Sequence, residues 1–278
     1  MSAEAHRFAV FGHPIAHSLS PEIHKAFATQ LGLRLSYETI DAAPGAFDDA
    51  VRRFFADGGL GANVTLPHKT AALTLAKKAS DAATRAGAAN TLTPLVGGGF
   101  EAHNTDGDGF VRDITERHGF DLRGHDALLL GAGGAAKAVA WALMDAGVQS
   151  LTIVNRSPEK ADAIADAIGE PARCRTRYWD GLDGECFDLV VNATSIGVTG
   201  GNFDLPMSIV QDHSTAYDLC YGAAAAGFKG WAIAAGVRPD WFRDGLGMLV
   251  EQAADAFEKW HGQRPDTDPV YRELRQRF

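Results

Sequence analysis

Apolar positions in the N-terminal third of the chain alternate between two spacings. Short runs of apolar residues predict strands at residues 7–12, 36–42 and 61–67. Apolar residues at helical spacing predict helices between and after these strands, at residues 20–32, 44–58 and 69–80. This alternation of strand and helix predicts a mostly parallel sheet that is covered by helices.

A hairpin interrupts the alternation. Residues 89–96 and 100–106 each have the composition of a strand, and Gly97 to Gly99 supply the turn between them. The pattern then restarts with an apolar strand that runs into an alanine-rich helix, at residues 126–147. Further strands are predicted at residues 150–157, 187–194 and 215–221.

Two strand-helix series in one chain predict two α/β domains. The chain has 278 residues, of which 46% are hydrophobic, and this is long for a single core. Residues 245–262 carry apolar positions at helical spacing, and we expect this helix to pack back on the first domain. With a seam near Asn104 to Gly109, the predicted domains are residues 1–105 with 241–278, and residues 106–240.

Composition excludes several functional classes. The 26 Lys and Arg residues are scattered and outnumbered by 35 Asp and Glu, so a nucleic-acid partner is not expected. No apolar run has the length of a membrane span, and the N-terminus lacks the features of a signal peptide, so we expect a cytoplasmic protein. Cys174, Cys186 and Cys220 are odd in number and far apart, which argues against a disulfide framework or a zinc ribbon.

A glycine turn follows the first strand of the second series. Gly131, Gly133 and Ala136 match the G-x-G-x-x-G/A spacing, directly after a strand and at the start of a helix. In this setting the free backbone N–H groups bind the phosphates of a dinucleotide. We therefore predict that the backbone of the turn holds a dinucleotide; its residues are Gly131, Ala132, Gly133, Gly134 and Ala135.

The end of the next strand indicates which dinucleotide. An NAD enzyme would place an Asp or Glu there, whereas this chain has Asn155, Arg156 and Ser157, with Lys160 close behind. The guanidinium group of arginine matches a phosphate in geometry and charge. We therefore predict that the cofactor is NADP(H). The alternative is that Arg156 is a solvated loop residue with no role in binding.

Polar residues in the first domain suggest proton-transfer chemistry. Lys69 stands at the predicted start of a helix, where its charge is unfavourable, and this cost suggests a use. Asp106 lies at the predicted seam, where it is expected to pair with the lysine. Asn90 is ambiguous, and Ser18 and Ser20 precede a helix at which they suit a carboxylate. The alternatives are a surface lysine, a turn aspartate and an N-cap serine.

Taken together, these residues resemble the shikimate dehydrogenase family in matching order over essentially the whole chain. The motifs that carry the resemblance are "FGHPIAHSLSP", "GANVTLPHK", "GAANTL", "NTDGDG", "GAGGAAKAV", "VNRS", "VNATSIG" and "GLGMLVEQAADAFEKWHG". The resemblance implies a substrate domain, a Rossmann domain for NADP(H), and reversible reduction of 3-dehydroshikimate to shikimate.

The resemblance also implies roles for individual residues. Lys69 and Asp106 match the catalytic pair, and Ser18 and Ser20 match the serines that bind the substrate carboxylate. Further substrate contacts are implied for Thr65, Asn90, Asp106, Tyr221 and Gln252. Further cofactor contacts are implied for Thr194, Leu219 and Gly245.

One segment departs from the family pattern. The family usually carries Y-x-P-x-x-T, whereas Ala223 and Ala226 stand at the proline and threonine positions here. Two alternatives remain open: a quinate/shikimate dehydrogenase paralogue that also accepts NAD, and a non-catalytic NADP-binding sensor. No metal is expected, because His13 and His17, although spaced four apart, fall in a loop and the chemistry needs none. Monomer and homodimer are both compatible with the sequence.

Overall fold

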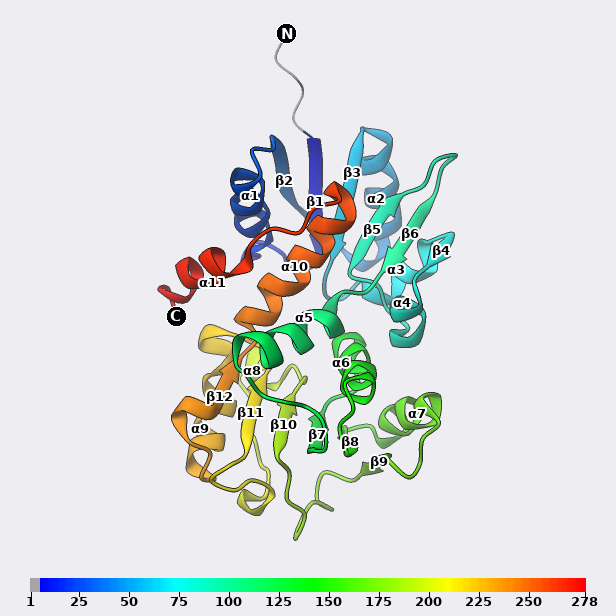
Figure 1. Cartoon of the computed structure of the whole chain (residues 1–278). Helices are drawn as coiled ribbons and strands as arrows, with labels where there is room; N and C mark the ends of the chain where they lie inside the picture. Colours follow the sequence, from blue (N-terminus) through cyan, green and yellow to red (C-terminus); the bar gives the residue numbers. More distant parts are fainter. Residues whose placement is uncertain (1–5) are drawn as a thin grey trace. The chain divides into compact units, whose positions relative to one another are not determined.

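The computed structural model describes residues 6–278, which divide into two compact units (Figure 1). Unit 1 is Met1–Gly109 with Val250–Arg277, and unit 2 is Phe110–Leu249 with Phe278. The first division follows Gly109. The second falls later than residue 240, because β12 (Phe242–Asp244) pairs with β11 (Thr215–Asp218) and so belongs to the sheet of unit 2.

Unit 1 is built on a six-stranded sheet in the order β2-β1-β3-β5-β6-β4. Its parallel part pairs β1 with both β2 and β3, and the predicted hairpin is the antiparallel pair β5 and β6. Strand β5 is also antiparallel to β3. The strands are β1 (His6–Gly12), β2 (Leu35–Asp41), β3 (Gly59–Val64), β4 (Lys78–Ala79), β5 (Thr91–Pro94) and β6 (Phe100–His103).

The helices of unit 1 follow the predicted order with one correction. The helix predicted at residues 69–80 ends at Leu75, because Lys77 N and Ser80 N donate to Phe100 O and Ala102 O beside β6. The chain then forms a separate helix, α4, which Ser80 caps through its side chain. The helices are α1 (Ser20–Gln30), α2 (Phe47–Ala56), α3 (Lys69–Leu75), α4 (Asp81–Ala86) and α11 (Thr267–Arg275).

Helix α10 (Leu246–His261) enters unit 1 at Val250. Its Trp260 ring stacks on Phe8 of β1 with centroids 4.9 Å apart, and its indole N–H donates to Leu92 O of β5. Gly61 of β3 faces the same ring. The helix therefore covers the sheet of unit 1 through an aromatic contact.

Unit 2 is a six-stranded, fully parallel sheet in the order β12-β11-β10-β7-β8-β9. The predicted strands are present, and two short ones, β9 and β12, were not predicted. The strands not yet given are β7 (Asp126–Leu130), β8 (Ser150–Val154), β9 (Cys174–Arg177) and β10 (Leu189–Asn192). The helices are α5 (Asp106–Arg112), which spans the division, α6 (Gly134–Asp145), α7 (Pro158–Ile168), α8 (Ile196–Thr199) and α9 (Ala226–Ala234).

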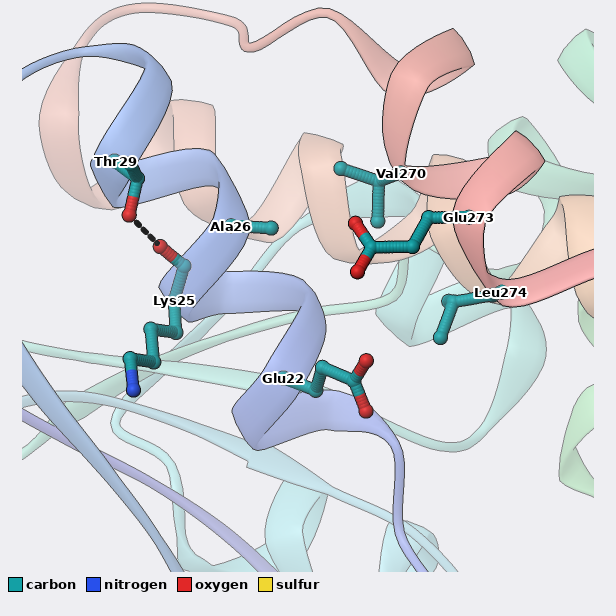
Figure 2. A pocket seen from close by; sticks show the side chains of 7 residues that line it. All are labelled: Glu22, Lys25, Ala26, Thr29, Val270, Glu273 and Leu274. Atoms are coloured by element: carbon teal, nitrogen blue, oxygen red, sulfur yellow. Dashed lines mark hydrogen bonds between the residues drawn. The ribbon is translucent and has the colours of Figure 1, made fainter. Parts of the chain in front are cut away.

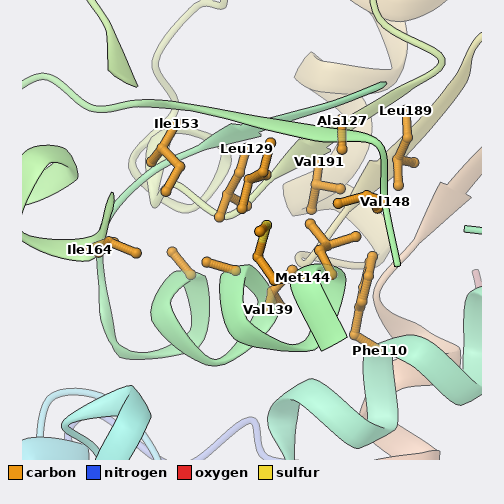
Figure 3. Close-up of a cluster of buried hydrophobic side chains, with 14 of the residues drawn as sticks. Phe110, Ala127, Leu129, Val139, Met144, Val148, Ile153, Ile164, Leu189 and Val191 are labelled. Atoms are coloured by element: carbon orange, nitrogen blue, oxygen red, sulfur yellow. The ribbon is translucent and has the colours of Figure 1, made fainter. Parts of the chain in front are cut away.

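A continuous apolar core joins helix α6 to this sheet. Figure 3 shows Val139 and Met144 of α6 directed at Leu129, Ile153 and Val191 on the strands. Near-continuous apolar strands are expected where helices cover both faces of a parallel sheet. The fold is thus α/β with two mostly parallel sheets, as predicted. Within residues 6–278, none of the helices combines the length and apolar character that a membrane crossing needs.

The Gly61→Ala substitution tests the packing of α10 on the sheet. A Cβ at position 61 would lie 2.4 Å from the Trp260 ring, which also stacks on Phe8, the residue paired with Gly61 on the neighbouring strand. We expect a loss of about 1–3 kcal/mol in the free energy of unfolding, as for other overpacked sites. Urea unfolding measures it. Gly45→Ala is the matched control, because a Cβ there meets nothing within 4 Å; equal stabilities of the two variants would contradict the packing.

Candidate active site

Polar residues gather at one edge of the sheet in unit 1. Ser18 and Ser20 follow β1, Thr65 and Lys69 follow β3, and both strands are parallel. Strand β5 runs in the opposite direction, so its beginning, after Asn90, meets this same edge, and the end of β6 returns there before Asp106. The hairpin therefore brings two further polar residues to the edge where parallel strands end.

Lys69 and Asp106 form a buried ion pair. Lys69 Nζ donates to Asp106 Oδ2 at 2.5 Å, and the two side chains are 15% and 5% exposed. Each is the first residue of its helix, α3 and α5. The predicted pairing is therefore present in the geometry, with an ammonium group and a carboxylate that can hold and pass a proton.

Asn90 holds the carboxylate of this pair. The two hydrogens of its amide nitrogen are shared among three acceptors: Asp106 Oδ1 at 2.8 Å, Thr105 Oγ1 at 2.9 Å and Gln252 Oε1 at 3.2 Å. Its oxygen accepts from Thr105 N at 3.0 Å. Gln252 approaches closely because Gly109 of α5 has no side chain; a Cβ there would lie 2.8 Å from Gln252 N. Thus Lys69, Asn90, Asp106 and Gln252 lie together.

The serines lie where β1 passes into α1. Leu19 is the N-cap of this helix, without a side-chain cap, so the N-cap alternative for Ser20 does not apply. Ser20 is buried, and its backbone N donates to Ser18 Oγ at 3.3 Å. Thr65 is anchored to the end of β1, because its backbone N donates to Phe11 O.

The histidines near these residues lie in different environments. His68, next to Lys69, is buried, contacts Ala42 O through Nε2 at 2.7 Å and stacks on Phe47. His24 is also buried among aromatic rings, whereas His13 pairs with Asp41 at the surface. In the part of the chain that the structure describes, no cluster of three or more His, Cys, Asp or Glu side chains is placed to hold a metal ion.

In unit 2 the predicted cofactor residues follow the carboxyl ends of five neighbouring strands. Gly131 follows β7, Asn155 follows β8, Thr194 follows β10, Leu219 follows β11 and Gly245 follows β12. Strand β7 lies between β8 and β10, so the connections diverge there to opposite sides of the sheet. Open α/β sheets bind ligands at this kind of switch point.

The glycine turn has the geometry that a phosphate-binding turn needs. Gly131 has φ +112°, and a Cβ there would lie 2.8 Å from Ala193 O, so only glycine fits without strain. Gly133 is the N-cap of α6, and a Cβ at this position would meet open space. A dinucleotide phosphate therefore has room against the free N–H groups of Gly134 and Ala135, while the buried Ala136 packs on the sheet.

The cations expected to hold a second phosphate lie at the surface. Arg156 and Lys160 are exposed, after β8 and in α7 respectively. The Asn155 side chain donates to Ser157 O at 2.9 Å and thereby shapes the turn between them. Tyr221 follows β11, and burial is the main cause that raises the pKa of its phenol above the ordinary value.

A groove between α1 and α11 lies away from these residues. Its volume is about 220 Å³, and none of the predicted site residues lines it. Figure 2 shows its lining, Glu22, Lys25, Ala26, Thr29, Val270, Glu273 and Leu274. Glu22 is ion-paired with Arg277, and Thr29 Oγ1 donates to Lys25 O of its own helix. We assign no ligand to this groove.

The fold and these two sets of residues define the class: a two-unit α/β oxidoreductase with a Rossmann-type dinucleotide unit. Three family models match the chain: "Shikimate dehydrogenase substrate binding domain" at residues 10–92, "Shikimate / quinate 5-dehydrogenase" at 113–195, and "Shikimate 5'-dehydrogenase C-terminal domain" at 245–275. A shikimate dehydrogenase (NADP(+)) of Xylella fastidiosa is 57% identical over 275 residues, covering 98% of this chain and 96% of that protein. The chain belongs to the shikimate dehydrogenase family.

Solved structures share the fold of this chain. An Ael1 enzyme from Pseudomonas putida superposes with a TM-score of 0.90 at 40% identity, covering 97% of this chain and 98% of that one. Shikimate 5-dehydrogenase from Thermus thermophilus, in complex with NADP(H) and shikimate, superposes with a TM-score of 0.82 at 34% identity, covering 98% and 100%. The family resemblance and the Rossmann-type fold are therefore confirmed.

The residues that support the ion pair were not predicted from the sequence. Thr105, Thr91 and Asn63 are buried and hydrogen-bonded around Asn90. Asn63 and Thr105 lie next to the recognised motif residues, but their partners are distant in sequence. Only the strand register, which sets Asn63 opposite Thr91 and Thr91 opposite His103, reveals the cluster.

Asp218 is a buried carboxyl group at the end of β11, at the edge of the sheet where the predicted cofactor residues lie. Its Oδ1 accepts from Asn192 Nδ2 and Cys220 N, and burial raises the pKa of its carboxyl from 3.8 to about 6 despite these bonds. The folded state thus binds more protons than the unfolded state between these values, and ionisation of Asp218 costs stability as the pH rises through about 6.

The Asp218→Asn side chain is neutral at every pH. We expect its free energy of unfolding, relative to that of the original protein, to be higher at pH 8 than at pH 5 by roughly 1–2 kcal/mol. Melting temperatures at the two pH values measure the change. Asp180→Asn, at an exposed position, should show no such trend. A stability difference for Asp218→Asn that is the same at both pH values would contradict the raised pKa.

Proposed function

We propose that this chain catalyses the reversible, NADP-dependent reduction of 3-dehydroshikimate to shikimate, a step toward chorismate and the aromatic amino acids. The observation that carries the proposal is the buried Lys69–Asp106 pair, held by Asn90, in a chain so similar to a shikimate dehydrogenase (NADP(+)). In this proposal unit 1 binds the substrate and unit 2 binds the cofactor.

Lys69 and Asp106 serve the oxygen of the reacting carbonyl. As the carbonyl carbon accepts a hydride, its oxygen gains negative charge and takes up a proton. The ammonium group of Lys69 stabilises that charge and lies where it can supply the proton, while Asp106 fixes the position of the ammonium group. In the reverse direction the pair accepts the proton from the shikimate hydroxyl.

The surrounding residues hold the substrate. Ser18 and Ser20 are assigned to its carboxylate, which their hydroxyls and the start of α1 favour. Thr65, Asn90, Asp106 and Gln252 are assigned to the ring hydroxyls, with Tyr221 of unit 2 at the carboxylate. Buried polar groups that pair with substrate hydroxyls also reject analogues that lack them.

NADP(H) supplies the hydride when it is bound. The Gly131–Ala135 backbone is assigned to its pyrophosphate, and Asn155, Arg156, Ser157 and Lys160 to its 2′-phosphate, because no carboxylate stands at the end of β8 to repel that group. Thr194, Leu219 and Gly245 are assigned to the remainder of the cofactor. We also propose a cytoplasmic location and a monomer or homodimer.

Initial rates with shikimate and with quinate, each against NADP and NAD, test the activity and the cofactor together. We expect turnover confined to shikimate with NADP, because Arg156 and Lys160 favour a phosphate and no acid favours a free ribose. Comparable rates with quinate or NAD would place the chain among the relaxed paralogues. Absence of turnover with every pair would favour a non-catalytic NADP-binding sensor.

The Lys69→Ala variant tests the chemistry of the pair. We expect kcat to fall by about a hundredfold to ten-thousandfold, the range typical of a lost proton-transfer group, with the fold retained by circular dichroism. Lys78→Ala, which removes an exposed lysine from β4 of the same unit, is the control and should keep its turnover. A Lys69→Ala protein with the original kcat would refute the assignment.

A further inference from the structure

A chain of hydrogen bonds in unit 1 leads from β2 to the catalytic carboxylate. The Tyr37 hydroxyl donates to Asn63 Oδ1 at 2.7 Å, and Asn63 Nδ2 donates to Thr91 Oγ1 at 3.2 Å. Thr91 Oγ1 donates to Asn90 Oδ1 at 2.9 Å, and Asn90 Nδ2 donates to Asp106 Oδ1 at 2.8 Å. Four donations therefore run in one direction and end on the partner of Lys69.

Each link in this chain sets the orientation of the next. An Asn side chain has a donor end and an acceptor end, and its neighbours decide which way it points. Tyr37 offers its only proton to Asn63, so the Asn63 amide nitrogen faces Asn90 O, at 3.1 Å, and Thr91. A flipped Asn63 would set its oxygen against that carbonyl. Thr91, already an acceptor, then gives its single proton to Asn90 Oδ1, which also accepts from Thr105 N, and these two donors together leave the Asn90 nitrogen facing Asp106.

Tyr37 is held firmly for this role. Its ring stacks on the fully buried His24 with centroids 4.3 Å apart and an interplanar angle of 12°. Burial lowers the pKa of His24 to about 3, more than the neighbouring Asn63 side chain raises it, so this ring is neutral. Burial also raises the pKa of the Tyr37 phenol well above its usual value, against a smaller effect of a hydrogen bond with Ser20, so the phenol keeps its proton.

We propose that Tyr37 is a positioning residue for the reaction: its hydroxyl orients Asn63 and, through Thr91 and Asn90, the Asp106 carboxylate that pairs with Lys69. The proposal rests on the proposed function, since it gives the oriented carboxylate its use. Tyr37 acts through other side chains, so it is distinct from the residues that meet the substrate.

Tyr37→Phe removes the hydroxyl and keeps the ring that stacks on His24. We expect kcat to fall by about tenfold to a hundredfold, as for small misplacements of reacting groups, with a smaller change in the KM for shikimate. Tyr217→Phe is the control: it also removes a phenol hydroxyl that donates to a side chain, here the Asp113 carboxylate in unit 2. An unchanged kcat in Tyr37→Phe, or an equal loss in Tyr217→Phe, would overturn the proposal.

A double-mutant cycle separates orientation through the chain from a general loss of stability. Thr91→Val breaks the middle link, and we expect the Tyr37→Phe change to cost little further kcat in that background. If the kcat losses of Tyr37→Phe and Thr91→Val multiply in the double variant, Tyr37 acts by another route and the proposal is overturned. Should Tyr37→Phe not fold, Thr91→Ser, which keeps the hydroxyl, should retain the kcat that Thr91→Val loses; equal losses would overturn it.

A measurement without substrate distinguishes this proposal from the proposed function. We expect the Asn90 side-chain amide protons, followed by NMR, to exchange with solvent at least about tenfold faster in Tyr37→Phe than in the original protein. If the original protein has no turnover on shikimate but Tyr37→Phe still shows the faster exchange, the proposed function is refuted and the hydrogen-bond chain stands. Unchanged exchange in an active enzyme would refute the chain alone.

Discussion

The buried ion pair between Lys69 and Asp106 is the interaction around which unit 1 is arranged. Removing an ammonium group and a carboxylate from water costs several kcal/mol for each ion, and their attraction offsets this only when geometry and further hydrogen bonds are favourable. The second oxygen of Asp106 accepts from Asn90, and Asn90 is held in turn by Thr105, Thr91 and Gln252. The polar cluster is therefore a condition for burying the pair.

The topology of the sheet supplies that cluster. A purely parallel sheet would bring only strand ends to this edge, each from a separate crossover. The antiparallel β5 brings a strand beginning there as well, and β6 returns its end to the same place. Asn90 and Asp106, separated by one hairpin, thus come within hydrogen-bonding distance of each other. In unit 2, by contrast, all strands are parallel, and the glycine turn presents backbone groups.

Local patterns in the sequence were sufficient to predict the two strand-helix series, the hairpin and the glycine turn, because each depends on residues close together in the chain. The short strands β4, β9 and β12 could not be predicted this way, since Lys78 and Ala79 are extended only because β6 lies beside them. The same holds within the site. The pairing of Lys69 with Asp106 was expected from their places at a helix start and at the seam, whereas Tyr37 lies in a strand with no motif and gains its place from the distant Asn63.

The segment after Tyr221, which departs from the family pattern, forms a helical turn without the proline. Gly222 has φ +61° and opens a short 3-10 turn that ends at Ala225, and α9 follows directly from Ala226. Proline suits the first turn of a helix because its φ is fixed there, and the glycine and alanines form such a turn without it. The hydroxyl that a threonine would supply at position 226 has no substitute, because alanine carries no polar group. Any polar contact from this turn to a ligand must therefore come from Tyr221 or from the backbone.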